Sequence, residues 1–397
     1  MHLNRQFEQL RQSATVAMAD RVAALLASGQ YVIPLQVGDP DFPTPQPILE
    51  AARRALQDGL THYAPSRGFL DLRLAAASKM QRNNGLTYDP TSEILVTHGG
   101  IHAYYLALQA ILEPGDEVLI PDPTWATHAN MVTMLRGTVK RVPAHPEDSF
   151  LPTFAAWEQA LTPQARVIVL NYPSNPTGAY PERAYLEWLQ TFADAHHLWI
   201  VSDEVYENLY YGGKPVSAGA FPGAKERTLL VHSLSKTYAM TGWRVGYLAA
   251  PARVIENALK AGQNSITCVA PFVQKAAAFA LSDPGVQTEA ANMRAQYARR
   301  RERVLQMAAE MQSEKVRVTP PMGAFYFFLD FRALGLPSSV ICERILEEAR
   351  VGLVPGSAFG TQGEGFARLS IAASDADVEE GFKKVVEWAD AQETKGD

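Results

Sequence analysis

The sequence predicts an α/β fold, with a large domain built on a mostly parallel central sheet covered by helices and a smaller α+β domain built from both termini. Residues 93–251 alternate short β-branched runs with longer helical patterns, which is typical of such a sheet. The flanking segments follow a different order, and 397 residues are more than a single core organises efficiently. We expect the large domain at residues 48–285 and the smaller one at residues 1–47 and 286–397.

The elements can be assigned in order along the chain. The first 30 residues indicate an amphipathic helix, and residues 33–47 a Pro-rich connector that contains Gly38. Apolar runs then indicate buried strands, and a long helical stretch at about residues 287–311 precedes the order strand, helix, strand, strand, helix. The strand runs are EILVTH (93–98), EVLIPD (117–122), RVIVLN (166–171), LWIVSD (198–203), LLVHS (229–233) and RVGYLAA (from 244); the last five elements are VRVTPPMGAFYFFLDF, SSVICERILEEA, VGLVPG, ARLSIA and DADVEEGFKKVVEWADAQ.

Composition excludes several classes of function. The net charge is −6 without long like-charge runs, which does not favour a nucleic-acid partner. Cys268 and Cys342 belong to no paired spacing, so neither a disulfide framework nor a thiolate metal site is expected. No signal peptide and no apolar run of membrane-spanning length is found. We therefore expect a cytoplasmic protein with no membrane partner.

The residues that follow the strands carry the candidate chemistry, because ligands of open α/β sheets bind beyond the carboxyl ends of the strands. Gly99-Gly100-Ile101 opens a helical pattern and suits a phosphate, although this signal is weak alone. Ser233, Ser235 and Lys236, with Arg244 eight residues further on, add two hydroxyls and a guanidinium. Since neither dinucleotide nor NTP glycine motifs occur at a strand-to-helix junction, the combination favours another phosphorylated cofactor.

Other polar residues at these strand ends leave two interpretations open. Asp203 ends an apolar run, so it either pairs with a donor or caps a helix. Tyr206 either faces the same pocket or packs in the core. Residues 171–178 form a rigid turn whose two Asn side chains are placed to contact a ligand. His98 and His102 are separated by two glycines and lack a suitably spaced carboxylate, so no metal site is expected.

Taken together, the motifs resemble class I pyridoxal-phosphate aminotransferases of fold type I, particularly the bacterial aspartate-aminotransferase-like branch. The resemblance runs from about Ser13 to the last helix, and the combination of NPTG with SLSK and a downstream GWR is specific. The motifs that carry it are LQVGDPDFPTP (35–45), HYAPSRG (62–68), THGG (97–100), NYPSNPTG (171–178), SDEVY (202–206), SLSKTYAMTGWRVGY (233–247) and PGSAFGTQGEGFARLS (355–370).

The resemblance implies a catalytic role for three residues. Lys236 would form the internal aldimine with pyridoxal 5′-phosphate and then move the proton of the substrate, for which it must be neutral. Asp203 would face the pyridine nitrogen and keep it protonated. Tyr206 would hydrogen-bond the phenolate oxygen of the ring together with Asn175, and Trp125 would stack on the ring.

The resemblance also implies phosphate and substrate contacts. Arg368 would bind the substrate α-carboxylate with its two-pronged guanidinium, assisted by Asn175 and the Gly38 backbone, and the smaller domain would close over the substrate. The implied form is a homodimer with shared active sites. The implied phosphate ligands are Ser233, Ser235, Arg244, the backbone of Gly100 and Ile101, and Tyr63 from the neighbouring subunit.

The expected activity is amino transfer between an L-amino acid and a 2-oxo acid. At Ile101 the aspartate-specific relatives carry a lysine that contacts the substrate side-chain carboxylate, so this sequence favours neutral, apolar or aromatic donors. A lyase with the same cofactor, such as a C–S β-lyase or a 1-aminocyclopropane-1-carboxylate-synthase-like enzyme, is the alternative. A DNA-reading regulator is disfavoured because the pattern begins almost at the N-terminus, and a cofactor-free scaffold because no residue with a chemical role is missing.

Overall fold

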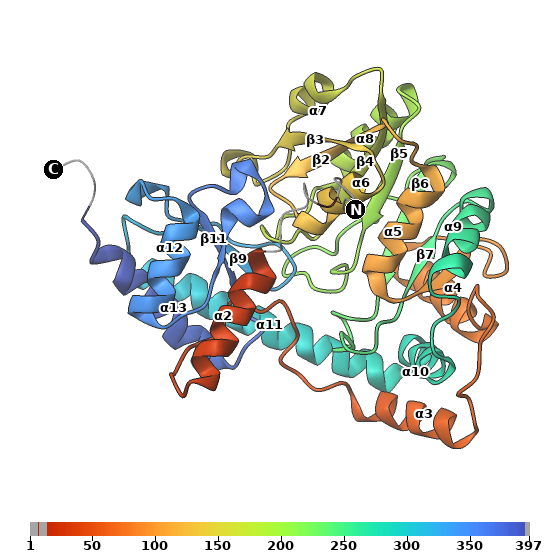
Figure 1. Ribbon diagram of the computed structural model, residues 1–397, viewed down its shortest axis with the longest axis horizontal. Helices are drawn as coiled ribbons and strands as arrows, with labels where there is room; N and C mark the ends of the chain where they lie inside the picture. Colours follow the sequence, from red (N-terminus) through yellow and green to blue (C-terminus); the bar gives the residue numbers. More distant parts are fainter. Residues whose placement is uncertain (1–6, 8–13, 394–397) are drawn as a thin grey trace, which may run out of the picture.

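The strands form two separate sheets. The computed structural model describes residue 7 and residues 14–393. A seven-stranded sheet has the order β1-β7-β6-β5-β4-β2-β3, and a four-stranded sheet has the order β10-β11-β9-β8. Figure 1 shows the small sheet beside the large one, with the N-terminal helix and the C-terminal elements gathered around the small sheet. The predicted α/β class agrees with this arrangement, and the predicted domain boundaries stay predictions.

The seven-stranded sheet is mostly parallel. β2 (Glu117–Asp122) pairs in parallel with β3 (Thr138–Pro143) and β4 (Ala165–Asn171), and the parallel pairing continues through β5 (Trp199–Asp203) to β6 (Thr228–Ser233). β7 (Gly246–Ala249) runs antiparallel to both β6 and β1 (Ile94–Thr97). The carboxyl ends of β2, β4, β5 and β6 therefore meet at one edge, as the sequence predicted.

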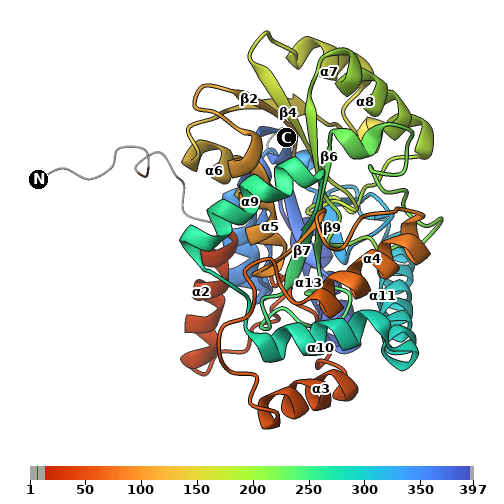
Figure 2. The same ribbon diagram turned by 90° about the vertical axis from the view of Figure 1, so that its right-hand side faces the viewer.

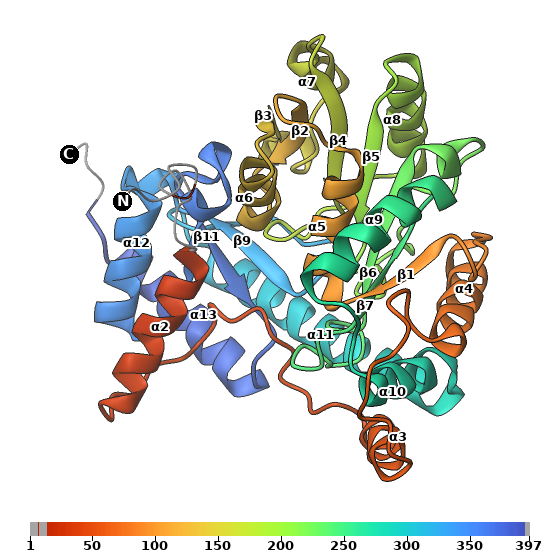
Figure 3. The same cartoon turned by 45° about the vertical axis from the view of Figure 1, so that its right-hand side comes forward.

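Helices cover both faces of this sheet, because its strands are apolar on both sides. On one face, alternate residues such as Val118 and Val167 pack with α5 (Gly99–Ile111), α6 (Ala126–Met134) and α9 (Ala252–Ser265), as Figure 3 shows for α5 and α9. Their neighbours in the strands form the other face. The helices there are α7 (Phe154–Ala160), α8 (Arg183–Ala195), α3 (Gln46–Gln57), α4 (Leu70–Asn84) and α10 (Pro271–Ser282).

The second sheet belongs to a core assembled from both ends of the described chain. Ile33 and Leu35 pack with residues of the C-terminal strands and helices in one apolar cluster. Figures 1 and 2 show the long helix α11 (Pro284–Met311) running from α10 toward this core. The other elements are α2 (Ala14–Ala27), β8 (Arg317–Val318), β9 (Tyr326–Asp330), α12 (Ser338–Arg344), β10 (Val354–Pro355), β11 (Phe366–Ser370) and α13 (Asp375–Asp390).

Several elements differ from the sequence prediction. β3 was not predicted, since this edge strand carries charged residues and only Val142 of its six residues is buried. The predicted strand at 316–331 is interrupted between β8 and β9, where Met322 and Gly323 donate their backbone N–H groups to Gly178. The predicted helix at 338–349 changes at Ile345 into a π-helix. Residues 1–6 and 8–13 of the predicted N-terminal helix lie outside the described residues.

Two glycines bring the backbone of β7 against the helix that follows β1. Gly99 has a φ of +74°, which favours glycine, and opens α5. A Cβ atom on Gly246 would lie 2.5 Å from the His232 carbonyl oxygen and 3.0 Å from the Gly100 nitrogen. The turn between β1 and α5 therefore packs directly on the backbone of β7 at Gly246.

None of the helices in the described part of the chain has the length and hydropathy needed to cross a lipid bilayer.

We expect Gly246→Ala to lower the free energy of unfolding by about 1–3 kcal/mol, because the added methyl group meets backbone atoms that cannot turn away. Gly242→Ala is the matched control, since a Cβ atom there meets nothing within 4 Å. Denaturant unfolding of both variants measures the difference. Equal stabilities of the two variants would contradict this explanation of Gly246.

Candidate active site

A cavity of about 310 Å³ lies at the carboxyl edge of the large sheet. It brings together every predicted site residue except Tyr63, whose side chain is 88% exposed and lies outside the cavity of the single chain. Thr15, Val205, Thr241 and Tyr326 also line it and were not predicted. The lining residues are Thr15, Gly38, Gly100, Ile101, Trp125, Asn171, Asn175, Asp203, Val205, Tyr206, Ser233, Ser235, Lys236, Thr241, Arg244, Tyr326 and Arg368.

Lys236 lies three residues beyond β6, with its ammonium group enclosed by the cavity wall. Its Nζ atom donates a hydrogen bond of 2.5 Å to the Gly38 carbonyl oxygen. Burial lowers the pKa of Lys236 to about 8, with Arg368 and Arg244 acting in the same direction and Asp39 opposing them. About one tenth of this lysine is therefore neutral at pH 7, far more than for an ordinary lysine.

Asp203, at the end of β5, has a hydrogen-bond partner that the sequence did not indicate. Its Oδ2 atom lies 3.0 Å from Nε2 of His128, and its Oδ1 atom accepts from the Val205 backbone at 3.3 Å. His128 is fully buried on α6, between the rings of Tyr104 and Trp125. Of the two interpretations left open for Asp203, the structure therefore supports a paired carboxylate. No sequence spacing marks His128, because its partner is 75 residues away.

Tyr206 and Tyr326 meet in the cavity wall. Their hydroxyl oxygens are 2.9 Å apart, and both side chains are buried. Burial raises the pKa of Tyr206 well above its usual value, and the neighbouring Tyr326 adds to the effect, so Tyr206 keeps its proton. Tyr326 belongs to an aromatic run that is also typical of plain core, which is why the sequence did not single it out.

Arg368, on β11, is the most deeply buried charge of the cavity. Its side chain is 2% exposed; Nη1 donates to Asn175 Oδ1 at 2.8 Å and Nη2 to the Gln36 carbonyl oxygen at 2.9 Å. The Nε–H group has no acceptor, and among the described residues no carboxylate pairs with this guanidinium. The ring of Tyr326 lies 4.3 Å from its central carbon. Arg368 is thus held in place but electrically uncompensated.

A set of anion-binding groups also lines the cavity. The first turn of α5 presents the backbone N–H groups of Gly100 and Ile101. The Ser233 hydroxyl donates to the Ser235 hydroxyl at 2.8 Å, so both lie side by side. Arg244 lies over the turn, because a Cβ atom on Gly99 would be 2.8 Å from Nη2 of Arg244. The set combines two hydroxyls, a guanidinium and a helix N-terminus, which suits a phosphate dianion.

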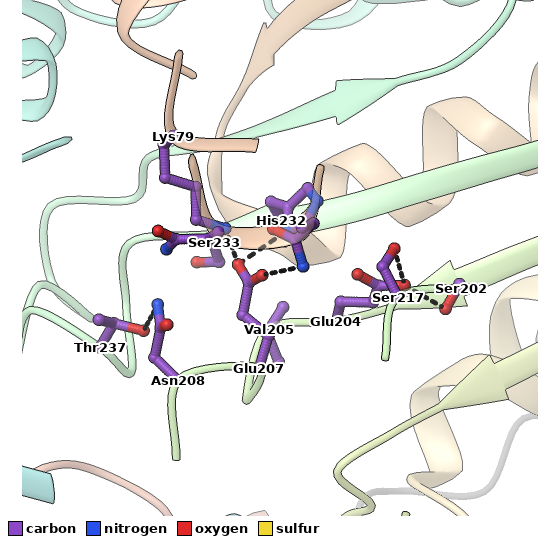
Figure 4. Close-up of polar contacts among 12 residues, drawn as sticks. Lys79, Ser202, Glu204, Val205, Glu207, Asn208, Ser217, His232, Ser233 and Thr237 are labelled. Carbon is purple, nitrogen blue, oxygen red and sulfur yellow. Dashed lines mark hydrogen bonds and ion pairs between the residues drawn. The ribbon is translucent and has the colours of Figure 1, made fainter. Parts of the chain in front are cut away.

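A buried ionic network supports the loops that carry these groups (Figure 4). The Glu207 carboxylate accepts from the Lys79 ammonium, lies 3.1 Å from Nδ1 of His232 and accepts from Asn84 at 3.3 Å. Burial alone would raise the pKa of Glu207, but Lys79 and His232 more than offset this and lower it. Glu207 therefore joins the loop after Asp203 to β6 and α4.

Glu204 lies beside this network, and its Oε1 atom accepts from Ser202, Ser217 and the Ala218 backbone. Burial raises the pKa of this carboxyl despite the opposing effect of His232. Glu204, Glu207 and His232 offer ligand atoms within 4.8 Å of one another, close enough for a metal ion. The ammonium of Lys79 already balances Glu207, so we assign the network to loop support; that the protein binds no metal stays a prediction.

Comparison with known proteins gives one consistent answer. A model of the family "Aminotransferase class I and II" matches residues 30–385. The chain is 41% identical to aromatic-amino-acid aminotransferase 2 of Thermococcus litoralis, covering 91% of this chain and 92% of that protein. It is 39% identical to the aspartate/prephenate aminotransferase of Thermus thermophilus, covering 97% of both.

Solved structures agree with the sequence relatives. Aspartate aminotransferase from Thermus thermophilus with maleate has a TM-score of 0.93 at 37% identity and covers 98% of this chain and 99% of that chain. Aromatic aminotransferase from Pyrococcus horikoshii OT3 has a TM-score of 0.88 at 40% identity, with 94% and 98% covered. These names do not favour the lyase alternative, and they confirm the fold-type-I architecture. The chain belongs to the class I and II aminotransferases, and its activity is the transfer of an amino group.

Proposed function

We propose that this aminotransferase holds pyridoxal 5′-phosphate in the cavity and moves the amino group of L-amino acids with neutral side chains to a 2-oxo acid. The observation that carries the proposal is the juxtaposition of Lys236, whose pKa burial lowers to about 8, with the uncompensated guanidinium of Arg368. An amine that is neutral in part can move a proton, and a buried cation without a counter-ion calls for a carboxylate. Amino acids and 2-oxo acids both bring one.

The donor set fits the proposed cofactor. Ser233, Ser235, Arg244 and the first turn of α5 would hold its phosphate. Trp125 lines the same cavity and would stack on the ring. When bound, the cofactor supplies an electron sink for the negative charge that develops at the substrate Cα.

The remaining residues would tune the ring and move the proton. Asp203, oriented by His128, would keep a pyridine nitrogen protonated through its negative charge. Tyr206 keeps its proton and would donate a hydrogen bond to the ring oxygen together with the amide of Asn175. Lys236, in its neutral form, would take the Cα proton of the substrate and return it to the carbon two bonds away.

Arg368 would bind the α-carboxylate of the substrate. A guanidinium presents parallel N–H donors that match the two oxygens of a carboxylate, and the Nε–H of Arg368 has no acceptor in the protein. Asn175 accepts a hydrogen bond from Arg368, and Gly38 lines the same cavity; both would fix the orientation of the carboxylate. Precise placement of the Cα–H bond near Lys236 would follow from these contacts.

The side chain of the donor would meet Ile101, which is 37% exposed at the cavity. The cations among the described lining residues are Lys236, Arg244 and Arg368, and each has another task in this proposal. A side-chain carboxylate would therefore lack a cationic partner, and apolar or aromatic side chains would fit better. The relatives include proteins named for aromatic amino acids and for aspartate, so their names do not distinguish the two donor classes. The proposed preference for neutral donors therefore rests on the residues of the cavity.

We also propose a homodimer in which Tyr63 of one subunit completes the phosphate site of the other. The exposure of this aromatic side chain, at 88%, supports the idea that it is used between subunits. A cytoplasmic location is proposed as well. Cys268 and Cys342 are free thiols, which fits a reducing compartment.

A visible absorption spectrum tests the proposal. Protein supplied with pyridoxal phosphate is mixed with single amino acids, and we expect the band of the bound cofactor to shift to shorter wavelength with neutral donors and to return when a 2-oxo acid is added. The Lys236→Ala variant is the control and should show no reversible cycle. An unshifted band with release of ammonia from β-substituted donors would instead support the lyase.

The pH dependence of covalent cofactor attachment follows from the pKa of Lys236. Because only the neutral amine reacts, the attachment rate of cofactor-free protein should rise with pH to a plateau, with a midpoint near 8. At pH 7 the rate should be roughly one tenth of the plateau value. Stopped-flow absorbance measures this rate; a midpoint above 10, as for an ordinary lysine, would contradict the effect of burial.

Replacement of Ile101 tests donor choice. Ile101→Lys places a cation beside the donor side chain and should raise kcat/KM for aspartate about tenfold or more, while lowering it for an aromatic donor. Ile101→Met is the matched control, since it keeps an apolar side chain of similar size. A wild-type preference for aspartate over all neutral donors would contradict this part of the proposal.

A further inference from the structure

The motif at residues 35–45 contains an acidic residue to which the proposed mechanism gives no task. Asp41 follows Gly38 by three residues, and both of its carboxylate oxygens accept hydrogen bonds from Arg300. The two distances are 2.8 Å each, from Nη1 and Nη2. This is the two-pronged geometry in which an arginine fixes both the position and the orientation of a carboxylate.

Arg300 lies on α11 and is itself held from several sides. Its guanidinium is buried, with the side chain 6% exposed. Nε donates to Asp375 at 2.7 Å, and Nη1 donates also to the Ile371 carbonyl oxygen at 3.1 Å. The rings of Phe42 and Tyr297 lie 5.3 Å and 5.6 Å from its central carbon. One side chain therefore joins α11, the connector and the segment that leads from β11 to α13.

The two segments that Arg300 joins are those that carry the substrate contacts. On the connector, the Gly38 carbonyl accepts from Lys236, and the Gln36 carbonyl accepts from Arg368. On the other segment, Ile371 follows Arg368 by three residues. The connector is further tied to β11 by the Ser370 backbone, which donates to the Leu35 carbonyl at 2.8 Å. A shift of the connector would therefore move two atoms together: the Gln36 carbonyl oxygen, which accepts from Arg368, and the Gly38 carbonyl oxygen, which accepts from Lys236.

We propose that Arg300 is a positioning residue, which through Asp41 holds the backbone of residues 36–41 in register with Arg368. The proposal rests on the proposed role of Arg368 as the site of the substrate carboxylate. The groups proposed to hold the cofactor phosphate and ring come from other segments, on the large sheet and its loops. Loss of the Arg300–Asp41 pair should therefore weaken the binding of substrate and leave the binding of cofactor unchanged.

Three variants and one control test this proposal in the cofactor-loaded protein. Arg300→Met removes the whole connection, and Asp41→Asn weakens it with little change of shape. Asp375→Asn weakens the hydrogen bond that Nε of Arg300 donates to residue 375 and leaves both hydrogen bonds to Asp41. Arg303→Met is the control, because Arg303 lies on the same helix and pairs with Glu379 at 39% exposure.

We expect Arg300→Met and Asp41→Asn to raise KM for the amino acid and for the 2-oxo acid roughly tenfold, with kcat within about threefold of wild type. Asp375→Asn and Arg303→Met should leave both KM values within about twofold. The affinity for pyridoxal phosphate should stay unchanged in all four, because the groups proposed to hold its phosphate and ring lie on other segments.

The outcomes separate this inference from the proposed function. Unchanged KM values in Asp41→Asn, with an active wild-type enzyme, overturn the inference alone. Equal rises in Asp41→Asn and Asp375→Asn also overturn it, because they would indicate general support of the fold. If Arg300→Met does not fold, Asp41→Asn decides the question. A wild-type protein without amino transfer would overturn the proposed function and, with it, the inference that rests on it.

Discussion

A buried cation without a protein counter-ion is the constraint on which the rest of the site depends. Arg368 is 2% exposed and is held by an amide oxygen and a carbonyl oxygen, which carry partial charge only. Burial of an uncompensated charge is costly, and this cost must be met by the surrounding fold. We propose that the carboxylate of a substrate completes this site. Its position, rather than any single catalytic residue, determines where a substrate would lie.

The fold places Arg368 by bringing segments that are distant in the sequence together at the carboxyl edge of the large sheet. β11 supplies Arg368, the connector supplies the Gln36 carbonyl oxygen that accepts from it, and the loop after β4 supplies Asn175. The loop after β6 places Lys236 close enough that two guanidinium groups help to lower its pKa. The same cations that favour an anionic ligand therefore also favour a neutral lysine, so recognition and proton transfer depend on one charge distribution.

The sequence predicts the parts of this account that depend on local patterns. The apolar runs correctly predicted β4, β5 and β6. The polar residues directly after these strands line the cavity, because the carboxyl ends of parallel strands lie at the same edge of the sheet. His128 and Tyr326 escaped prediction because their roles come from partners far along the chain. The network around Glu207 was missed for the same reason, since Lys79 lies 128 residues from Glu207 in the sequence. Tyr63 stays a prediction, because a residue used between subunits has no partner within one chain.

A crystal structure of the cofactor-loaded protein with an amino acid that bears a methyl group in place of the Cα hydrogen tests the central claim most directly. Such a substrate binds but has no Cα proton to lose, so it reports the bound geometry. The account predicts that its carboxylate lies on Arg368, with the formerly unpaired Nε–H donating to one oxygen, and that its methyl group points toward Lys236. A carboxylate bound elsewhere, with Arg368 still uncompensated, would contradict the account.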